Sequence, residues 1–425
     1  MEQERIEELL KKKGIGPLGS KSLSADEVKL VRDLFIHSKV SLTTKATMLT
    51  ALLMLEANPD ETKLINEIKA DPKSKLPAEL VNFIESDRKN PFQNLVNKTI
   101  NKENLTTQEA STAMDFFFNT EEPAFLKASF LEAQRLKRET FVENQAFLHA
   151  LWNKARRITI DQKPVIHICD SFDGSNRTRN YVVFVAALLA AAGYNCIVSG
   201  IDSVAPKQGV TAHQILQEGG KKPLLSMQEA SAELQNIGWS YIDQAVFMPE
   251  LYAFKNMRKE MVKRPFLATF EKLLQPIRSA TENYIVTGYT HPHYREELVK
   301  QLKEHKQCSK AIILKGMEGN THLSLSKESV CVQLDGEIIS DSMVSPQHYT
   351  LTGMEEKQDK NITAQTSLEE GLAAFKGVKN YARESILYLA AVILDRFKLQ
   401  PASVVDKLSN LIDDGFAIQK FNEKA

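Results

Sequence analysis

The sequence predicts an α/β protein with a small all-helical amino-terminal domain and a larger domain whose mostly parallel central sheet is flanked by helices. Two observations predict this class. Residues 1–160 are rich in Leu, Glu, Lys and Ala, and their apolar residues recur three and four positions apart, as on one face of a helix. After residue 161, short β-branched runs alternate with helical segments, which is typical of a parallel sheet.

The helical part repeats itself at an interval of 82 residues without a gap, so that Leu23 falls on Leu105 and Glu61 on Glu143. The other identical pairs are Glu27 and Glu109, Asp33 and Asp115, Phe35 and Phe117, Ala46 and Ala128, Leu49 and Leu131, and Ala51 and Ala133. Each copy opens with a hydroxyl residue three positions before a glutamate, which is the signature of a capping box. We therefore expect an apparently duplicated helical region, with copy 1 in residues 1–90 and copy 2 in residues 91–160. Chance similarity between two amphipathic helices is the alternative.

Residues 161–425 are expected to form the larger domain. The runs that predict its strands are 164–169, 195–198, 245–248, 284–287 and 310–314. The helical segments between them are 180–192, 211–218, 227–236 and 294–305. Residues 322–339 alternate without helices and predict strands at one end of the sheet, and residues 366–414 return to helix. Part of 250–280 is expected to pack with the helical domain.

Composition and charge argue against several classes of protein. The 54 Lys and Arg balance 54 Asp and Glu, so there is no bulk attraction to nucleic acid or to anionic membranes, although a local basic patch is compatible with this balance. The longest apolar run, 181–192, is shorter than the roughly 20 residues that span a bilayer, and it predicts a buried helix. The 4 cysteines form no C-x-x-C pair, which argues against a zinc ribbon and favours reduced thiols in a cytoplasmic protein.

The segment Cys169-Asp-Ser-Phe-Asp-Gly-Ser-Asn-Arg-Thr-Arg179 links a predicted buried strand to a strongly apolar helix. Ligands of open α/β sheets bind outside the carboxyl ends of strands, and free amides at a helix start attract anions. Arg177 and Arg179 would add charge for a phosphate. A polar turn that merely caps the helix is the alternative.

Two further segments carry polar or basic residues. The loop 199–209 follows the next predicted strand and precedes Thr211, a candidate helix cap. The segment 255–264 carries five basic side chains in ten residues. Such a run alone is typical of a solvated helix face, but it would complete a basic pocket if it faced the two loops.

These three segments, in this order, resemble the anthranilate phosphoribosyltransferase family over residues 91–420. Asp173-Gly174-Ser175-Asn176 matches the end of the family signature G-T-G-G-D-G and the Ser-Asn after it, while residues 169–172 differ. In the second signature, K-H-G-N-R-S, Gly200 and Ser203 remain, and Lys207 matches the rest of that loop.

The remaining matches concern the acceptor and the metal. Arg258 matches an arginine that helps to hold anthranilate in the family, and Arg264 matches the start of the segment R-T-x-F-N-x-L-G-P. The acidic Asp-Glu pair that binds magnesium in the family is reduced to Glu318. The resemblance therefore implies a weakened Mg²⁺ site at Glu318. It implies a ligand site in the cleft between the domains, formed by Asp173, Gly174, Ser175, Asn176, Arg177, Gly200, Ser203, Lys207, Arg258 and Arg264.

The departures from the family pattern resemble those of a divergent nucleic-acid-binding paralogue branch. Phe172 stands where a glycine would let backbone amides approach a pyrophosphate. A single carboxylate holds magnesium more weakly than a pair. These degenerate motifs argue against anthranilate as the acceptor and against a role in tryptophan biosynthesis.

Two functions remain as hypotheses. The first is a glycosyltransferase of the phosphoribosyltransferase type with a changed acceptor, which binds a phosphoribosyl pyrophosphate-like or nucleotide ligand. Catalysis in this family relies on positioning and electrostatic stabilisation, so it needs no nucleophile. The alternative is a non-catalytic nucleic-acid-binding homodimer, based on the basic run and the degenerate loops. Whether the chain is an enzyme is left open; the resemblance implies a homodimer in either case.

Overall fold

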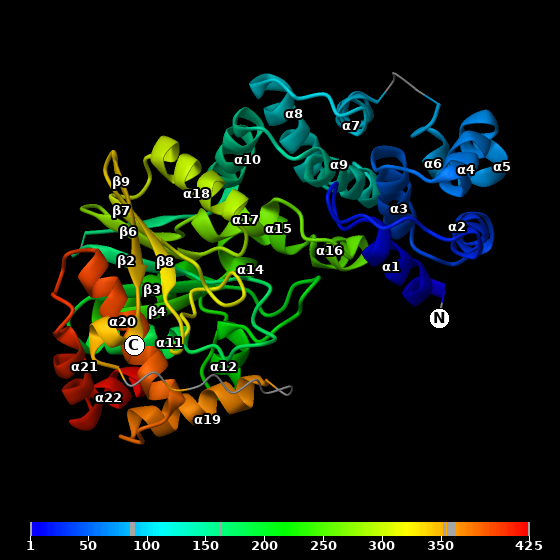
Figure 1. Ribbon diagram of the computed structural model, residues 1–425. Helices are drawn as coiled ribbons and strands as arrows, with labels where there is room; N and C mark the ends of the chain where they lie inside the picture. The colour runs from blue at the N-terminus through cyan, green and yellow to red at the C-terminus, as the bar shows by residue number, and fades with distance from the viewer. Residues whose placement is uncertain (1, 86–89, 162, 352–353, 355–361, 424–425) are drawn as a thin grey trace. The chain divides into compact units, whose positions relative to one another are not determined.

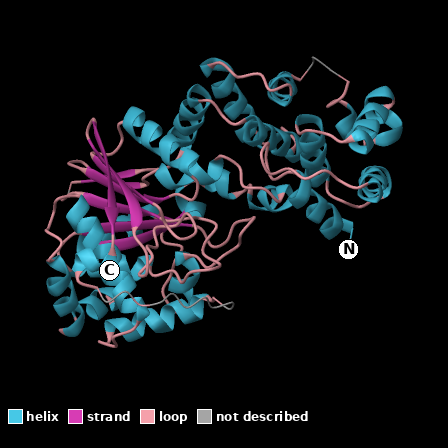
Figure 2. Cartoon of the chain, viewed as in Figure 1, coloured by secondary structure: helices cyan, strands magenta, loops and turns pink. Residues whose placement is uncertain are grey.

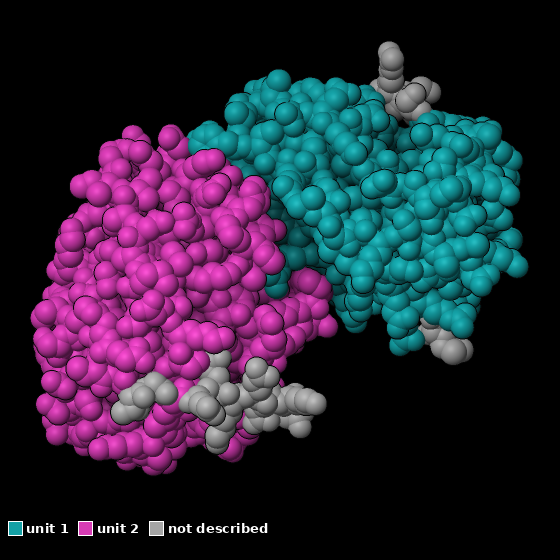
Figure 3. Space-filling view, viewed as in Figure 1, with its two compact units in different colours: residues 1–150, 253–267 teal, residues 151–252, 268–425 magenta. Residues whose placement is uncertain are grey.

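The computed structural model describes residues 2–85, 90–161, 163–351, 354 and 362–423. It divides into two compact units, coloured separately in Figure 3. Unit 1 comprises residues 1–150 and 253–267, and unit 2 comprises residues 151–252 and 268–425. Every described strand belongs to unit 2, and Figure 2 shows unit 1 as helices joined by loops.

Unit 1 is a helical array. Its helices are α1 (Glu2–Lys13), α2 (Ala25–His37), α3 (Leu42–Met54), α4 (Pro59–Ala70), α5 (Pro72–Lys75), α6 (Ala78–Val81), α7 (Pro91–Ile100), α8 (Thr107–Phe118), α9 (Ala124–Lys137), α16 (Lys255–Met261) and the first ten residues of α10 (Phe141–Lys154), whose last turn belongs to unit 2. The capping boxes at Ser24 and Thr106 form with both of their hydrogen bonds. Helices α3 and α9 pack together at the centre, where Thr50 Oγ1 lies 3.1 Å from Ser129 Oγ.

Equivalent hydrogen bonds occur 82 residues apart in unit 1. Glu61 Oε1 accepts the amide of Leu23 at 3.0 Å, and Glu143 Oε1 accepts the amide of Leu105 at 2.9 Å. The second oxygen of each carboxylate accepts an equivalent amide, of Asn58 (2.9 Å) at Glu61 and of Thr140 (2.7 Å) at Glu143. It also accepts an ammonium group, but from non-equivalent lysines, Lys13 (2.9 Å) and Lys137 (2.7 Å). The two aligned carboxylates therefore accept equivalent backbone amides in both copies, whereas their ammonium partners come from different positions of the repeat.

Unit 2 contains nine described strands: β1 (Ile158–Ile160), β2 (Val165–Cys169), β3 (Asn195–Gly200), β4 (Trp239–Asp243), β5 (Ile277–Ser279), β6 (Asn283–Gly288), β7 (Lys310–Leu314), β8 (Ser329–Asp335) and β9 (Ile338–Val344). The main sheet has the order β4-β3-β2-β6-β7-β8-β9. Its first five strands are parallel, and the hairpin of β8 and β9 is antiparallel. The sequence predicts strands at one end of the sheet from residues 322–339 but not their antiparallel direction. Strands β1 and β5 form a separate parallel pair.

The remaining helices belong mostly to unit 2, and Figure 1 labels all of them except α13. They are α11 (Val182–Ala191), α12 (Ala212–Glu218), α13 (Met227–Ile237), α14 (Gln244–Phe247), α15 (Pro249–Tyr252), α17 (Leu267–Phe270), α18 (Pro292–His305), α19 (Ala364–Phe375), α20 (Tyr381–Arg396), α21 (Val404–Asp413) and α22 (Phe416–Asn422). Helix α11 packs on β3 and β4 and against α20 and α22, which explains why it is apolar on all sides. None of the described helices has the length and apolar character that crossing a membrane requires.

One predicted strand is wrong. Residues 245–248 were expected to form a strand, but 244–247 form the short helix α14, and the strand β4 lies directly before it. Asp243 causes the change, because its Oδ1 accepts the amide of Ala245 at 2.8 Å and turns the chain at the end of β4. A short apolar run does not by itself distinguish a buried strand from a buried helix.

Candidate functional site

Three loops of unit 2 meet at the carboxyl-terminal edge of the sheet. They are residues 170–181 after β2, 201–211 after β3 and 315–323 after β7. The strand order reverses beside β2, which has β3 on one side and β6 on the other. Such a switch point is where open α/β sheets bind their ligands.

The first two loops touch through their backbones. Ser175 and Val210 exchange two backbone hydrogen bonds, of 3.0 and 2.9 Å. A Cβ atom on Gly174 would lie 2.3 Å from the carbonyl oxygen of Gly209, and Gly174 has a φ of +75°. Only glycine tolerates both the contact and the backbone conformation.

The backbone amides of the first loop converge on a carboxylate of the third. Glu318 Oε1 accepts the amides of Arg177 and Thr178, both at 2.7 Å, and its Oε2 accepts the amide of Asn176 at 3.1 Å. Thr178 Oγ1 donates a further bond of 2.9 Å. Lys207 Nζ, from the second loop, lies 2.7 Å from Glu318 Oε2. We call the three amides, the Thr178 hydroxyl and Lys207 the anion nest.

The electrostatics of the anion nest favour a negative charge. Burial by itself raises the pKa of Glu318, whose side chain is 1% exposed. The ammonium of Lys207 and the amides of Asn176 and Arg177 outweigh burial and lower the pKa to about 2. The sequence predicted free amides in this turn, and the structure instead has them occupied by an ionised carboxylate from the chain itself.

A second set of polar contacts fixes the third loop to the end of β2. Asp170 Oδ1 accepts the amide of Thr321 at 3.0 Å, and its Oδ2 accepts Asn180 Nδ2 at 3.0 Å. Asn320 Nδ2 donates to Ser175 Oγ at 2.9 Å and to Thr178 Oγ1 at 3.1 Å. Burial raises the pKa of Asp170, and the hydrogen bond from the backbone amide of Thr321 partly offsets that rise. These bonds hold the loop that carries Glu318 against the loop that carries the nest amides.

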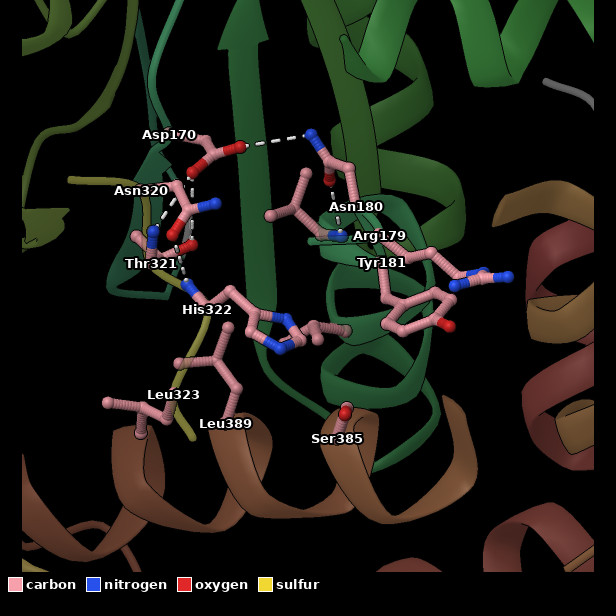
Figure 4. Close-up of a pocket in the computed structure, with 12 residues that line it drawn as sticks. Asp170, Arg179, Asn180, Tyr181, Asn320, Thr321, His322, Leu323, Ser385 and Leu389 are labelled. Carbon is pink, nitrogen blue, oxygen red and sulfur yellow. Dashed lines mark hydrogen bonds between the residues drawn. The ribbon is translucent and has the colours of Figure 1, made fainter. Parts of the chain in front are cut away.

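A small cavity lies behind these contacts, and Figure 4 shows its lining. The volume of this cavity that the centre of a water molecule can occupy is about 20 Å³, which is enough for about one water molecule. Ser385 of α20 points into it, and Ser385 Oγ has no hydrogen-bond partner among the described residues. His322 also lines it, and burial lowers the pKa of His322 to about 4, so the ring is neutral at pH 7. The cavity suits a water molecule that bridges buried polar groups.

The structure brings most of the predicted site residues together in unit 2. Asp173, Gly174, Ser175, Asn176 and Arg177 lie on the first loop, Gly200 ends β3, and Ser203 and Lys207 lie on the second loop. The Arg177 side chain is 73% exposed, with Nε 3.9 Å from Glu318 Oε2. Arg179 pairs with Glu370 at 2.8 Å and does not contribute to the nest.

The two predicted arginines of the basic run belong to unit 1. Arg258 of α16 is only 1% exposed, which differs from the solvated face that its spacing suggests, whereas Arg264 is exposed. Lys263 donates to the carbonyl of Lys11 at 3.1 Å. The basic run is therefore divided between the interior and the surface of unit 1.

Metal ligands do not gather around Glu318. Among the residues that the structure describes, no group of three His, Cys, Asp or Glu side chains is placed to hold an ion. Both oxygens of Glu318 already accept hydrogen bonds. The carboxylate of Asp173, on the first loop, accepts the hydroxyl of Ser171 at 2.5 Å. The Glu318 carboxylate is therefore engaged by donors of the chain itself in this structure.

Sequence reasoning missed four residues that build the site: Asp170, Thr178, Asn320 and Thr321. All four lie inside or beside the segments that it singled out, since Asp170 and Thr178 are in the first loop and Asn320-Thr321 follows Glu318-Gly319 directly. The available signal was a polar cluster after a strand end. Which of its members face each other depends on contacts between distant segments.

Comparison with known proteins gives a consistent result. The chain is 24% identical over 341 residues to an anthranilate phosphoribosyltransferase of Thermoanaerobacter sp. (strain X514), covering 78% of this chain and 97% of the relative. It is 26% identical over 302 residues to one from Geobacillus sp. (strain WCH70), covering 71% and 86%. No family model matches the chain.

Solved structures agree with these relatives. Anthranilate phosphoribosyltransferase from Thermus thermophilus superimposes with a TM-score of 0.65 at 19% identity, covering 77% of this chain and 97% of that chain. The chain has the anthranilate phosphoribosyltransferase fold. The enzyme from Saccharomyces cerevisiae in complex with PRPP and Mg has the same fold, with a TM-score of 0.63, 14% identity and coverage of 80% and 97%. The predicted fold class is confirmed, and the relatives support the family that the motifs resemble.

Proposed function

We propose that unit 2 binds a phosphoribosyl pyrophosphate-like or nucleotide ligand, with its phosphates at the turn of residues 173–178 and at Lys207. One observation carries this proposal: three consecutive amides and an ammonium group converge on one anion. Backbone amides arranged in this way bind phosphate as well as carboxylate. The yeast enzyme of the same fold, in complex with PRPP and Mg, supports the ligand class.

The proposal includes a phosphoribosyltransferase reaction with an acceptor other than anthranilate, in a cytoplasmic homodimer. Any Mg²⁺ that accompanies the pyrophosphate is held weakly, because Glu318 is engaged with amides and Lys207. Arg258 and Arg264 remain predicted ligand-binding residues. Light scattering tests the homodimer, which has twice the 47.8 kDa of one chain.

Calorimetric titration with phosphoribosyl pyrophosphate in magnesium buffer tests the ligand. We expect saturable heat at millimolar ligand or below, and we expect Lys207→Met to weaken binding about tenfold, the effect of losing one charged hydrogen bond. Glu282→Gln is the control, since Glu282 lies before β6 at the opposite edge of the sheet and contacts Tyr284. The absence of heat from the wild-type chain would contradict the proposal.

A gel-shift assay tests the alternative function, nucleic-acid binding. A gel shift with single- and double-stranded DNA at low salt would show retardation that disappears as salt rises, since phosphate contacts release counterions. We expect no retardation, because net charge is zero and Arg258 is buried. Retardation that salt abolishes would favour the alternative.

A further inference from the structure

Glu318 occupies the place that the proposed function gives to a ligand. Its carboxylate takes every described donor of the anion nest, and its side chain is 1% exposed. A carboxylate and a phosphate oxygen use the same kind of donor, an N–H group or an ammonium. The nest therefore already contains an anion, supplied by a loop 140 residues further along the chain.

A second anion does not fit beside this carboxylate. Each amide has a single proton, and the protons of Asn176, Arg177 and Thr178 are all given to Glu318. A phosphate placed near the nest while Glu318 remains there would face a like charge in a buried setting, which is strongly unfavourable. Occupancy by Glu318 and occupancy by a ligand exclude each other.

We propose that Glu318 is a built-in competitor for the anion nest, so that a pyrophosphate group binds only when the Glu318 side chain leaves it. This inference rests on the proposed function, because it concerns the same site. It assigns Glu318 a role opposite to that of a magnesium ligand: it restrains anion binding instead of supporting it.

The guanidinium group of Arg177 is a second partner that the Glu318 side chain could pair with outside the nest. Arg177 Nε already lies 3.9 Å from Glu318 Oε2, and the Arg177 side chain is 73% exposed. A rotation of the Glu318 side chain towards this guanidinium group would keep the charge paired while it frees the amides. The backbone of the third loop stays fixed during this rotation by the bonds from Asp170 to Thr321 and from Asn320 to Ser175.

Titration with inorganic pyrophosphate in metal-free buffer tests the competition. The chains compared are wild type, Glu318→Gln and the control Glu282→Gln, which removes the same charge at the opposite sheet edge. If the nest is open in fewer than about a tenth of the wild-type molecules, freeing it raises the apparent affinity about tenfold or more. We expect this gain for Glu318→Gln and none for Glu282→Gln.

The outcomes separate the inference from the proposed function. Equal or weaker pyrophosphate binding by Glu318→Gln, with a wild type that binds, overturns the inference and leaves the proposed function in place. No binding by any chain overturns both. Glu318→Asp serves as a second variant, because it keeps the charge but is one methylene too short to reach all three amides, and we expect it also to bind more tightly than wild type.

Discussion

The environment of single residues decides what the candidate site is able to bind. Glu318 resembles a metal ligand in the sequence because it stands where the family has an Asp-Glu pair. Its bonds in the structure are to amides and to Lys207, and they favour the ionised form so strongly that its pKa falls to about 2. Its chemistry is that of an internal anion.

Gly174 gives a test of the backbone contact that shapes the anion nest. Gly174→Ala places a Cβ atom 2.3 Å from the Gly209 carbonyl oxygen at a φ of +75°. We expect a loss of about 2–4 kcal/mol in the free energy of unfolding, from strain and overpacking together. Urea denaturation measures it.

Gly336→Ala is the matched control for that substitution. Gly336 also has a positive φ, +60°, but its added Cβ would have no atom within 4 Å. We expect a loss of only about 1 kcal/mol there, from the left-handed backbone conformation alone. Equal losses at Gly174 and Gly336 would show that the contact between the loops contributes nothing.

Helices in unit 1 are joined by carboxylates that recur with the repeat. Glu143 ties the start of α8, through Leu105, to the start of α10, through Thr140. Burial by itself raises the pKa of Glu143, but Lys137 and these two amides outweigh burial and lower it. Its stabilising effect is therefore fully present above the ordinary pKa of 4.5 and is lost as the pH falls below that value.

Glu143→Gln tests this tie between helices. We expect the variant to lose about 2–4 kcal/mol of stability at pH 7, because a buried ammonium and two amides lose a charged partner. The difference from wild type should shrink as the pH falls from 5 to 3. Urea unfolding across this range measures it, and Glu103→Gln, an exposed position, is the control. A difference that stays constant with pH would contradict the assigned charge state.

The two helical copies depend on each other in the whole molecule. Helices α3 and α9 pack together, and the alanines that the repeat aligns, Ala46 with Ala128 and Ala51 with Ala133, are all 0% exposed. Helix α16, from the segment 253–267, packs against both of these helices. Copy 1 is therefore part of the core of unit 1.

A chain that begins at residue 90 tests this dependence. Without α3, the apolar face of α9 and one side of α16 become exposed to solvent. An exposed apolar patch of this kind destabilises a protein and promotes its aggregation. We expect the shortened chain to bind a hydrophobic dye and to lose the cooperative unfolding of unit 1, measured by circular dichroism. A shortened chain that melts as the full chain does would show that copy 1 is an independent appendage.

Local patterns were sufficient for much of the fold. The capping boxes at Ser24 and Thr106, the apolar helix α11 and four of the five predicted strands depend on neighbours along the chain, so the sequence predicts them correctly. The strand expected at 245–248 failed because Asp243 ends β4 and turns the chain before it, a contact that an apolar run does not reveal.

By itself, the sequence determined the α/β class, the 82-residue repeat and the position of the polar loops after the strands, because these follow from periodicity and from the order of strands and helices. Only the tertiary structure decided what each polar residue does. Glu318 meets the amides of residues 176–178, and Asp170 meets Thr321, across more than a hundred positions of chain. Such pairings depend on which loops the sheet brings to one edge, and no local pattern encodes them.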